Sequence, residues 1–423
     1  MSDAVTAPRN HTQRRVLRVA LILLLLSVTV LERFGLTSGA VSVSAAMLAI
    51  YPFLGIAGLA GQLVLSLERT LLYGVCMAVA LGSLLANEQS SSFSSFALLG
   101  AMYLPFVFVL RQGALADDDA SWIYARFLDV CLLCAAAGVA QFALQFVIHA
   151  HWLFDYSSYI PAPLRMNGIF NTVIPVGSFN KSNGFFFREP SGFSYLMALG
   201  LIVETVTTRR PWRVAVMGAA LLLTYSGTGI LALLLASLYP FGVKTVLRVS
   251  GIALAGALVF WLLGDALNLS FTLGRVNEFS SDSTQSSGYI RYIAPGRLVV
   301  ETFVDTPFSA FIGHGPGTIF RTLRSFEFHD PTWAKLLFEY GGLGFLGFLS
   351  LFLLTLRRRS LPVQLRAALF WGWFVMGGHL LSPEQNFLTL VLVGLTPFGS
   401  ALASAPARTD SARVAPLSRA AWA

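Results

Sequence analysis

The residues of this chain best suited to chemistry are charged side chains standing directly before apolar runs. Arg188, Glu189 and Pro190 form the first such group. Proline favours the first turn of a helix, so Pro190 predicts a helix start. A guanidinium beside free helix N–H groups and the helix dipole can bind phosphate. Arg188 is therefore a candidate anion ligand, with Lys181 and Asn183 just upstream. The alternative is an Arg–Glu pair that only anchors the helix at an interface.

A second group precedes another apolar run. Asp330 stands before Pro331, which is the pattern of a helix N-cap and would by itself account for that carboxylate. His329 titrates near neutral pH and is a candidate general base. Glu339 lies about two helical turns further on, where a lone carboxylate is costly in lipid, and Lys335 four residues earlier can pair with it. Glu339 is thus either a functional carboxylate or half of a structural ion pair.

A third group runs from Arg291 to a glycine-rich stretch at 313–317. Arg297, Glu301 and Asp305 recur every four residues, which predicts one face of a short amphipathic helix. The glycine-rich stretch lacks the Lys-Ser/Thr ending of a nucleotide-binding loop. We expect it instead to form a tight turn that brings the chain back to the apolar segments.

Metal and thiol chemistry find little support in the residue pattern. No metal-ligand spacing occurs among the six histidines. Cys76, Cys131 and Cys134 all lie inside apolar runs, and the C-x-x-C pair has no second ligand pair nearby. Core packing is therefore the expected role of these cysteines, and neither a disulfide framework nor a metal site is expected.

The amino-acid composition indicates whether water or lipid surrounds these groups. The 423 residues are 55% hydrophobic and only 12% charged, whereas soluble domains carry about 25% charged residues. We therefore expect an all-α polytopic membrane protein, in which each span takes roughly 20 apolar residues. No cleavage site follows the first apolar run, so that run is expected to be retained. About twelve spans are expected, at 16–31, 39–63, 70–86, 95–110, 127–148, 191–207, 213–226, 228–243, 249–268, 333–356, 366–382 and 387–404. The segment between the seventh and eighth spans is either a tight turn or a break in one longer element.

The basic residues set the orientation of these spans. With the N-terminus in the cytoplasm, about two thirds of the 29 basic residues fall on the inner side, as the positive-inside rule requires. The net charge of +8 is then a sign of topology, and nucleic-acid binding is not expected. The chain divides into a cytoplasmic tail (1–15), helices 1–5 (16–148), a large periplasmic loop (149–190), helices 6–9 (191–268), a second large periplasmic loop (269–332), helices 10–12 (333–404) and a cytoplasmic tail (405–423).

The two large outer loops are expected to be functional. Long connections in compact proteins are uncommon and tend to carry function, and all but one of the outer basic residues lie in or beside these two loops. Anion binding is the expected role of these arginines and lysines. Solvated charges balanced by nearby carboxylates are the alternative.

Several motifs recur in the order seen in one membrane-protein family. They are Thr224–Gly229, Arg291 sixteen residues ahead of Pro307, the turn at 313–317, Asp330–Trp333 leading into Glu339–Gly344, and Arg188–Ser191 upstream. This order resembles the O-antigen polymerase and O-antigen ligase family, over about a third of the chain. The resemblance implies a GT-C-like membrane glycosyltransferase of the bacterial inner membrane, with its active site facing the periplasm and without nucleotide, metal or cofactor.

The resemblance also implies a substrate and roles for single residues. The donor would be an oligosaccharide on undecaprenyl diphosphate, held by Arg188 and Arg291 with support from Arg297 and Lys181. His329 or Asp330 would be the base for the acceptor hydroxyl. Glu339 would complete the catalytic set, and the glycan would contact Glu189, Trp152 and Tyr156. A chain-length regulator and export proteins are expected as partners, beside the lipid bilayer itself.

The chain departs from the family pattern at two places. Ligases place a histidine nine residues before the glutamate, where this chain has Asp330, with His329 one position off. The Ser-Arg often present in the first motif is Ser226-Gly227 here. Both departures favour a polymerase of exopolysaccharide or O-antigen repeat units. The alternatives are a ligase that transfers glycan to lipid A-core and, in another class, a flippase or carrier of lipid-linked oligosaccharides.

Overall fold

The computed structural model describes most of the helical part of the chain. The described residues are 11–38, 41–116, 118–166, 170–240, 242, 247, 250–251, 254, 288–303, 307–321, 326–357, 362–376 and 378–395. Several predicted features lie outside the described residues. They are most of the expected span at 249–268, the part of the second loop before residue 288, Asp305, and the two ends of the chain at 1–10 and 396–423.

The described chain is mostly helical, and three of its helices are long and apolar enough to cross a membrane. These are α3 (Leu67–Ala86), α5 (Asp119–Leu144) and α13 (Thr332–Leu356), with 20, 26 and 25 residues. Each meets the length that a bilayer core requires. The shorter apolar helices are α2 (Ala45–Leu59), α4 (Phe93–Tyr103), α6 (Pro190–Val206), α7 (Pro211–Leu222) and α8 (Gly227–Ser237).

Helix α6 lies at the centre of the molecule. All of residues 193–204 are buried, as expected for a helix that is apolar around its whole circumference. It packs against α5, α7, α8 and α14 (Val363–Val375). Gly200 allows this close packing, because a Cβ there would lie 2.9 Å from Met217 Sδ and 3.1 Å from Cys131 Sγ. All three cysteines are buried and unbridged, which confirms their predicted packing role.

The first spans differ from the prediction in their ends. Helix α1 (His11–Ser27) is followed by a hairpin of β1 (Gly35–Ser38) and β2 (Val41–Ser44). The expected span at 39–63 therefore begins with a strand, and its helix begins only after Ser44, whose side chain accepts a hydrogen bond from Met47 N. A second short sheet pairs β3 (Leu63–Leu65) with β4 (Phe108–Leu110). Both sheets lie within or beside apolar runs, where hydropathy alone does not distinguish strand from helix.

The predicted starts of the sixth and tenth spans are confirmed. Pro190 occupies the first turn of α6, and α13 begins at Thr332. The segment between α7 and α8 is a turn around Tyr225 at φ 46°, so the helix is interrupted between the expected seventh and eighth spans. The last span is shorter in the described residues: α15 (Pro383–Thr389) continues as a π-helical turn, η8 (Leu390–Gly394).

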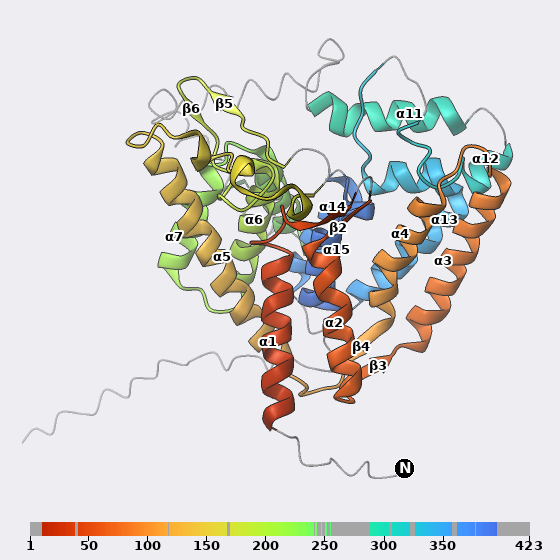
Figure 1. The fold of residues 1–423 in the computed structure, drawn as a ribbon, viewed down its shortest axis with the longest axis horizontal. Helices are drawn as coiled ribbons and strands as arrows, with labels where there is room; N and C mark the ends of the chain where they lie inside the picture. Colours follow the sequence, from red (N-terminus) through yellow and green to blue (C-terminus); the bar gives the residue numbers. More distant parts are fainter. Residues whose placement is uncertain are drawn as a thin grey trace, which may run out of the picture.

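The two expected outer loops lie at one end of the helices, opposite the N-terminus (Figure 1). The first contains the sheet of β5 (Pro175–Val176) and β6 (Phe179–Asn180). The second contains a π-helical turn η6 (Tyr289–Ile293), α11 (Ala294–Phe303) and α12 (Pro307–Ile312). The first loop is not wholly a surface loop, because residues 181–184 are buried. There Ser182 Oγ donates to Gly138 O of α5 at 3.0 Å.

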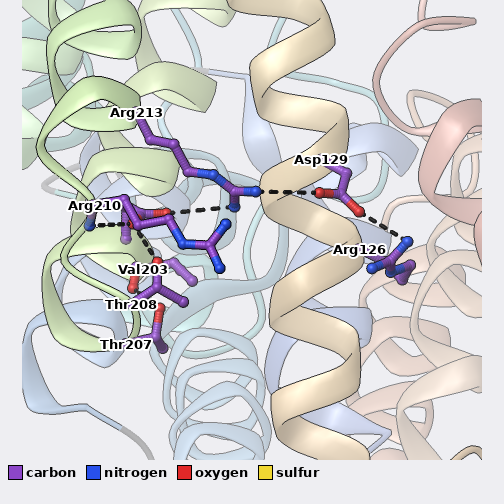
Figure 2. A network of polar contacts seen from close by, with 8 residues as sticks. Arg126, Asp129, Val203, Thr207, Thr208, Arg210 and Arg213 are labelled. Carbon is purple, nitrogen blue, oxygen red and sulfur yellow. Dashed lines mark hydrogen bonds and ion pairs between the residues drawn. The ribbon is translucent and has the colours of Figure 1, made fainter.

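An ionic network joins α5, α6 and α7 at the other end of these helices. Arg213 lies 3.8 Å from Asp129 and 3.7 Å from the buried Glu204, and Arg126 lies 2.9 Å from Asp129 (Figure 2). Glu204 also accepts a hydrogen bond from Arg210 N at 2.8 Å. Arg126 and Asp129 are exposed, whereas Glu204 is fully buried. Removing Arg213 would therefore leave the buried charge of Glu204 without its cation, so this pair helps to align α6 with α7.

Candidate functional site

A polar cavity of about 310 Å³ lies where the start of α6 meets the ends of several other helices. Its wall is made by segments that are far apart in the sequence, including the turn after α1, the π-helical turn η6 and the start of α15. The lining residues are Glu32, Arg188, Glu189, Ser191, Gly192, Tyr195, Thr228, Arg291, Tyr292, His329, Val375, Met376, Gly378, His379, Ser382, Glu384 and Gln385.

Four of the predicted site residues meet in this cavity. They are Arg188, Glu189, Arg291 and His329. Arg291 Nη2 donates to Glu189 Oε2 at 3.5 Å. The backbone N–H of His329 donates to Ile290 O at 3.0 Å, so the two parts of the second outer loop are tied together beside the cavity. The structure thus brings two of the four predicted diphosphate ligands, Arg188 and Arg291, and one predicted base to one place.

The start of α6 contributes a helix N-terminus to the cavity wall. Glu189 is extended, with φ −135° and ψ 151°, and Pro190 begins the helix. Glu189 accepts a hydrogen bond from Ser191 Oγ at 2.8 Å and makes no side-chain cap. Ser191 and Gly192 both line the cavity. The first N–H groups of a helix have no intrahelical partner, so this wall carries partial positive charge.

Arg188 is half-buried and held at the cavity wall. Its Nη2 donates to Glu32 O at 3.4 Å, and Thr172 N donates to Arg188 O at 2.9 Å. Its buried Nε has no hydrogen-bond partner within the part of the chain that the structure describes. The guanidinium therefore retains donor capacity for a ligand.

Two carboxyl groups of the cavity, Glu32 and Glu384, were not predicted as site residues. Burial and the charge of Glu384 together raise the pKa of Glu32 to about 7, against the opposing effect of Arg188 and Arg33. Glu384 accepts a hydrogen bond from Ser382 Oγ at 3.2 Å. Glu32 directly follows an apolar run, and no motif in the sequence marks it as a site residue. Ser382-Pro383-Glu384 repeats the pattern of a proline helix start beside a carboxylate, and this signal could have found Glu384.

His329 is exposed and borders the cavity. Partial burial and the nearby charge of Arg291 lower the pKa of His329, although Asp330 and Glu189 oppose this. The imidazole is therefore mainly neutral at pH 7 and able to accept a proton. A second imidazole, His379, also lines the cavity and is oriented by a contact of 2.6 Å between its Nδ1 and Gly372 O.

Asp330 does not line the cavity. Its carboxylate accepts a hydrogen bond from the buried Lys335 Nζ at 2.8 Å, and Lys335 lies 4.0 Å from Glu339. The N-cap prediction for Asp330 is wrong, because Pro331 occupies the cap position and the Asp330 side chain turns to Lys335 instead. Of the two predicted bases, only His329 lines the cavity.

Glu339 is part of a packing arrangement between α13 and the glycine-rich turn. Glu339 O accepts hydrogen bonds from Gly315 N at 3.0 Å and from Ser83 Oγ at 2.7 Å. A Cβ on Gly313 would lie 2.4 Å from the Glu339 carbonyl carbon. The predicted tight turn is confirmed, and its glycines let it contact the α13 backbone directly. Glu339 is fully buried and lies outside the cavity wall.

The remaining predicted ligands lie elsewhere. Lys181 is buried, and its Nζ donates to Tyr225 O at 3.2 Å. Arg297 forms an ion pair of 2.7 Å with Glu301 on α11, which confirms that part of the predicted helix face, and its guanidinium lies over the Phe326 ring at 4.5 Å. Neither residue lines the cavity.

The two predicted glycan contacts, Trp152 and Tyr156, are also outside the cavity wall. Trp152 is exposed in a 3-10 turn. Tyr156 stacks on Phe185, with ring centroids 4.9 Å apart, and the guanidinium of the buried Arg33 lies 5.0 Å from its ring centroid. Tyr156 therefore helps to support the loop behind the cavity.

No protein-family model matches the chain, and neither a curated protein nor a solved structure is similar to it. Among the described residues, no three His, Cys, Asp or Glu side chains converge as a metal site. The fold and the cavity together define a mostly helical protein with membrane-length apolar helices and a pocket of guanidinium, carboxyl and imidazole groups.

Proposed function

We propose that this chain is a membrane glycosyltransferase that polymerises undecaprenyl-diphosphate-linked oligosaccharide units at the periplasmic face of the inner membrane, for an exopolysaccharide or O-antigen. The observation that carries the proposal is the convergence of Arg188, Arg291 and His329 on one cavity. The sequence predicts all three as site residues, and they come from two separate loops. A cavity with two guanidiniums and an imidazole supports the handling of an anion beside a proton acceptor.

The diphosphate of the donor would lie between the two arginines and the start of α6. Arginine binds phosphate oxygens in a bidentate manner, and its charge persists at any physiological pH. The free N–H groups of Ser191 and Gly192 add donors with the favourable dipole direction. Charge that develops on the diphosphate during transfer is thereby stabilised by groups that are already in place.

The acceptor hydroxyl would be activated by His329. Its neutral imidazole takes the hydroxyl proton while the hydroxyl oxygen attacks the anomeric carbon. The bond between that carbon and the diphosphate oxygen breaks, and the lipid diphosphate leaves with the electron pair. Asp330 is less suited to the role of base, because Lys335 already holds its carboxylate.

The membrane setting supports a lipid-linked donor. Helices α3, α5 and α13 are long and apolar enough to cross a bilayer, and the outer loops that carry Arg188, Arg291 and His329 lie at one end of them (Figure 1). A cavity at that level would be within reach of a lipid headgroup in the membrane and of a glycan outside it. A chain-length regulator and export proteins are the partners that this activity would require.

The test is polymer formation by the purified protein in nanodiscs supplied with lipid-linked repeat units. Wild-type protein lengthens the glycan, whereas Arg188→Ala and Arg291→Ala lower the rate by about 100-fold or more, the cost of removing one group that stabilises developing charge. Arg188→Lys keeps the charge and loses the bidentate geometry. Arg297→Ala is the matched control, because Arg297 lies in the same outer region outside the cavity and should retain activity.

Three outcomes contradict the proposal in different ways. Transfer of finished glycan to lipid A-core without elongation assigns the chain to the ligases. Translocation of lipid-linked oligosaccharide without any glycosyl transfer assigns it to the flippases or carriers. Unchanged elongation in Arg188→Ala returns this residue to the role of a helix anchor.

A further inference from the structure

The cavity holds a pair of carboxyl groups that the proposed reaction does not yet use. Glu32 follows α1 and Glu384 lies in the first turn of α15, yet both line the same wall as Arg188. The carboxylate oxygens of Glu32 also lie close to the start of α6, since a Cβ on Gly192 would be 3.9 Å from them. Glu32 therefore borders the position at which the α6 N-terminus and Arg188 would hold a phosphate group.

The charged groups of the cavity fall into two sets. The charges of Arg188 and Glu384 shift the pKa of Glu32, whereas those of Arg291 and Glu189 shift the pKa of His329. A ligand that fills the space between the sets meets a carboxyl group at one side and an imidazole at the other. The two titratable groups also differ in protonation, because the environment raises the pKa of Glu32 to about 7 and lowers the pKa of His329. Opposite shifts of this kind are typical of an acid and a base that act together.

We propose that Glu32 is the general acid of the glycosyl transfer, which protonates the departing diphosphate while His329 accepts the proton of the attacking hydroxyl. This inference rests on the proposed function. It assigns the carboxyl group at the Arg188 side of the cavity to the leaving group and the imidazole at the Arg291 side to the nucleophile.

The step is balanced in atoms, protons and charge. The acceptor oxygen forms a bond to the anomeric carbon, and its proton passes to His329. The bond from the anomeric carbon to the diphosphate oxygen breaks, and that oxygen receives both the electron pair and the proton of Glu32. The products are a lengthened glycan, a singly protonated lipid diphosphate, an imidazolium and a carboxylate. A return of the proton from His329 to Glu32 through solvent restores the starting state, and no further reactant is needed.

Glu384 is a positioning residue in this arrangement. Its negative charge opposes ionisation of Glu32 and so keeps the acid protonated, while Arg188 and the buried Arg33 act in the opposite sense. The other titratable groups near Glu32 are Tyr156, in the first outer loop, and the buried thiol of Cys134 in α5. When a diphosphate occupies Arg188, its negative charge should strengthen protonation of Glu32 further.

The first test is the pH dependence of single-turnover transfer. Wild-type protein should lose rate as the pH rises above 7, because Glu32 ionises at a pKa that the bound diphosphate raises further. Glu32→Gln should lose about 100-fold or more of the rate and should lack this alkaline decline. Glu384→Gln should move the decline to lower pH, because it removes the charge that favours protonated Glu32. Glu327→Gln, on an exposed outer carboxylate, should match wild type in both rate and profile.

The second test reads the proton directly and needs no activity. Infrared difference spectra between pH values about two units below and above 7 should contain the C=O band of a protonated carboxylic acid. The band should disappear in Glu32→Gln and persist in Glu327→Gln. When decyl diphosphate is added to wild-type protein, the band should persist to higher pH, because an anion at Arg188 favours the protonated form of Glu32.

The outcomes separate this inference from the proposed function. If Arg188→Ala and His329→Gln are inactive while Glu32→Gln keeps the wild-type rate and profile, the acid role is wrong and the glycosyltransferase stands. If wild-type protein transfers no sugar at all, the proposed function fails together with the acid role, even where the infrared band is present. An infrared band that is unchanged in Glu32→Gln also overturns the assignment of the proton.

Discussion

The side chains nearest to the proposed chemistry are held by a second layer of charges. Lys335 lies 2.8 Å from Asp330 and 4.0 Å from Glu339, and all three are buried. This cluster directly follows His329 in the chain, and Gly378 N donates to Asp330 O beside the cavity at 3.1 Å. The cluster thus holds the backbone from which His329 extends. Asp330 and Glu339, which the sequence suggested as catalytic, can therefore support the site without contacting a substrate.

We expect Lys335→Met to destabilise the protein strongly. The substitution leaves two buried carboxylates without their cation, and breaking a buried ion pair costs about 3–5 kcal/mol. The measurement is the midpoint of thermal unfolding in detergent, which should fall well below that of wild type. Adding Asp330→Asn and Glu339→Gln should recover part of the loss. An unchanged midpoint in the single variant would show that the cluster carries no stability.

We expect the activity of wild-type protein to decline at acid pH because of His329. Its pKa is lowered by partial burial and by Arg291, so the neutral base is lost only as the pH falls through a value below the ordinary one. His329→Gln should reduce the rate of transfer by about 100-fold or more and should abolish this acid decline. The check is the rate measured across pH in both proteins. A wild-type acid limb in the variant would assign the base to another group.

The elements that present these side chains meet through glycine. Helix α13 is interrupted at Gly341, which has φ 64° and ψ −168°. A Cβ at this position would lie 2.4 Å from the carbonyl of Phe311 in α12. The kink therefore permits direct backbone contact between α12 and α13, and it separates the part of α13 that carries Lys335 and Glu339 from the rest of the helix.

We expect Gly341→Ala to be far more damaging than Gly342→Ala. Alanine at 341 meets both a left-handed backbone and the Phe311 carbonyl, whereas a Cβ at 342 has only an ordinary contact of 3.5 Å with Ala310 O. Strain at such a position costs on the order of 1–3 kcal/mol before any clash is counted. Comparison of the two thermal midpoints is the test. Equal midpoints would mean that α12 can move away without loss.

Sequence patterns predicted the elements better than they predicted the partners of each side chain. Pro190 marks the start of α6 and residue 332 that of α13, because proline and polar residues at an apolar boundary act locally. The β1–β2 hairpin after α1 and the β3–β4 sheet were missed, since short apolar strands resemble parts of a span. Glu32 and Glu384 were missed for another reason: they become neighbours only when α1 and α15 pack into one fold, and spacing along the chain carries no sign of that.

At the scale of the whole molecule, the charged groups divide between two ends. β5–β6 and α11 lie at one end (Figure 1). The cavity adjoins the start of α6, whereas the Arg213–Asp129–Glu204 network lies near the other end of this helix (Figure 2). Basic residues gather at the predicted inner side, which accords with the positive-inside rule. The membrane orientation itself is the prediction on which the proposed substrate depends.

We expect two engineered cysteines to report opposite sides of the membrane. Gln89, between α3 and α4, is predicted outside, and Gln112, between α4 and α5, is predicted inside; both side chains are exposed. A maleimide that crosses the outer membrane but not the inner membrane should label only Gln89→Cys when it is applied to intact cells. Gln112→Cys should react only after lysis, and the buried native thiols provide a low background. Labelling of Gln112→Cys alone in intact cells would show the opposite orientation, with the cavity on the cytoplasmic side.

The buried stretch 181–184 has a practical consequence for those who would handle this protein. It separates the first outer loop into a portion that tolerates an inserted epitope and a portion that does not. Ser158 and Tyr159 are exposed, in a 3-10 turn that contains no buried residue, so an affinity tag placed there should reach its antibody on whole spheroplasts. A tag placed near Ser182 would have to enter the space beside Gly138, and the protein would be lost to quality control before it could be purified.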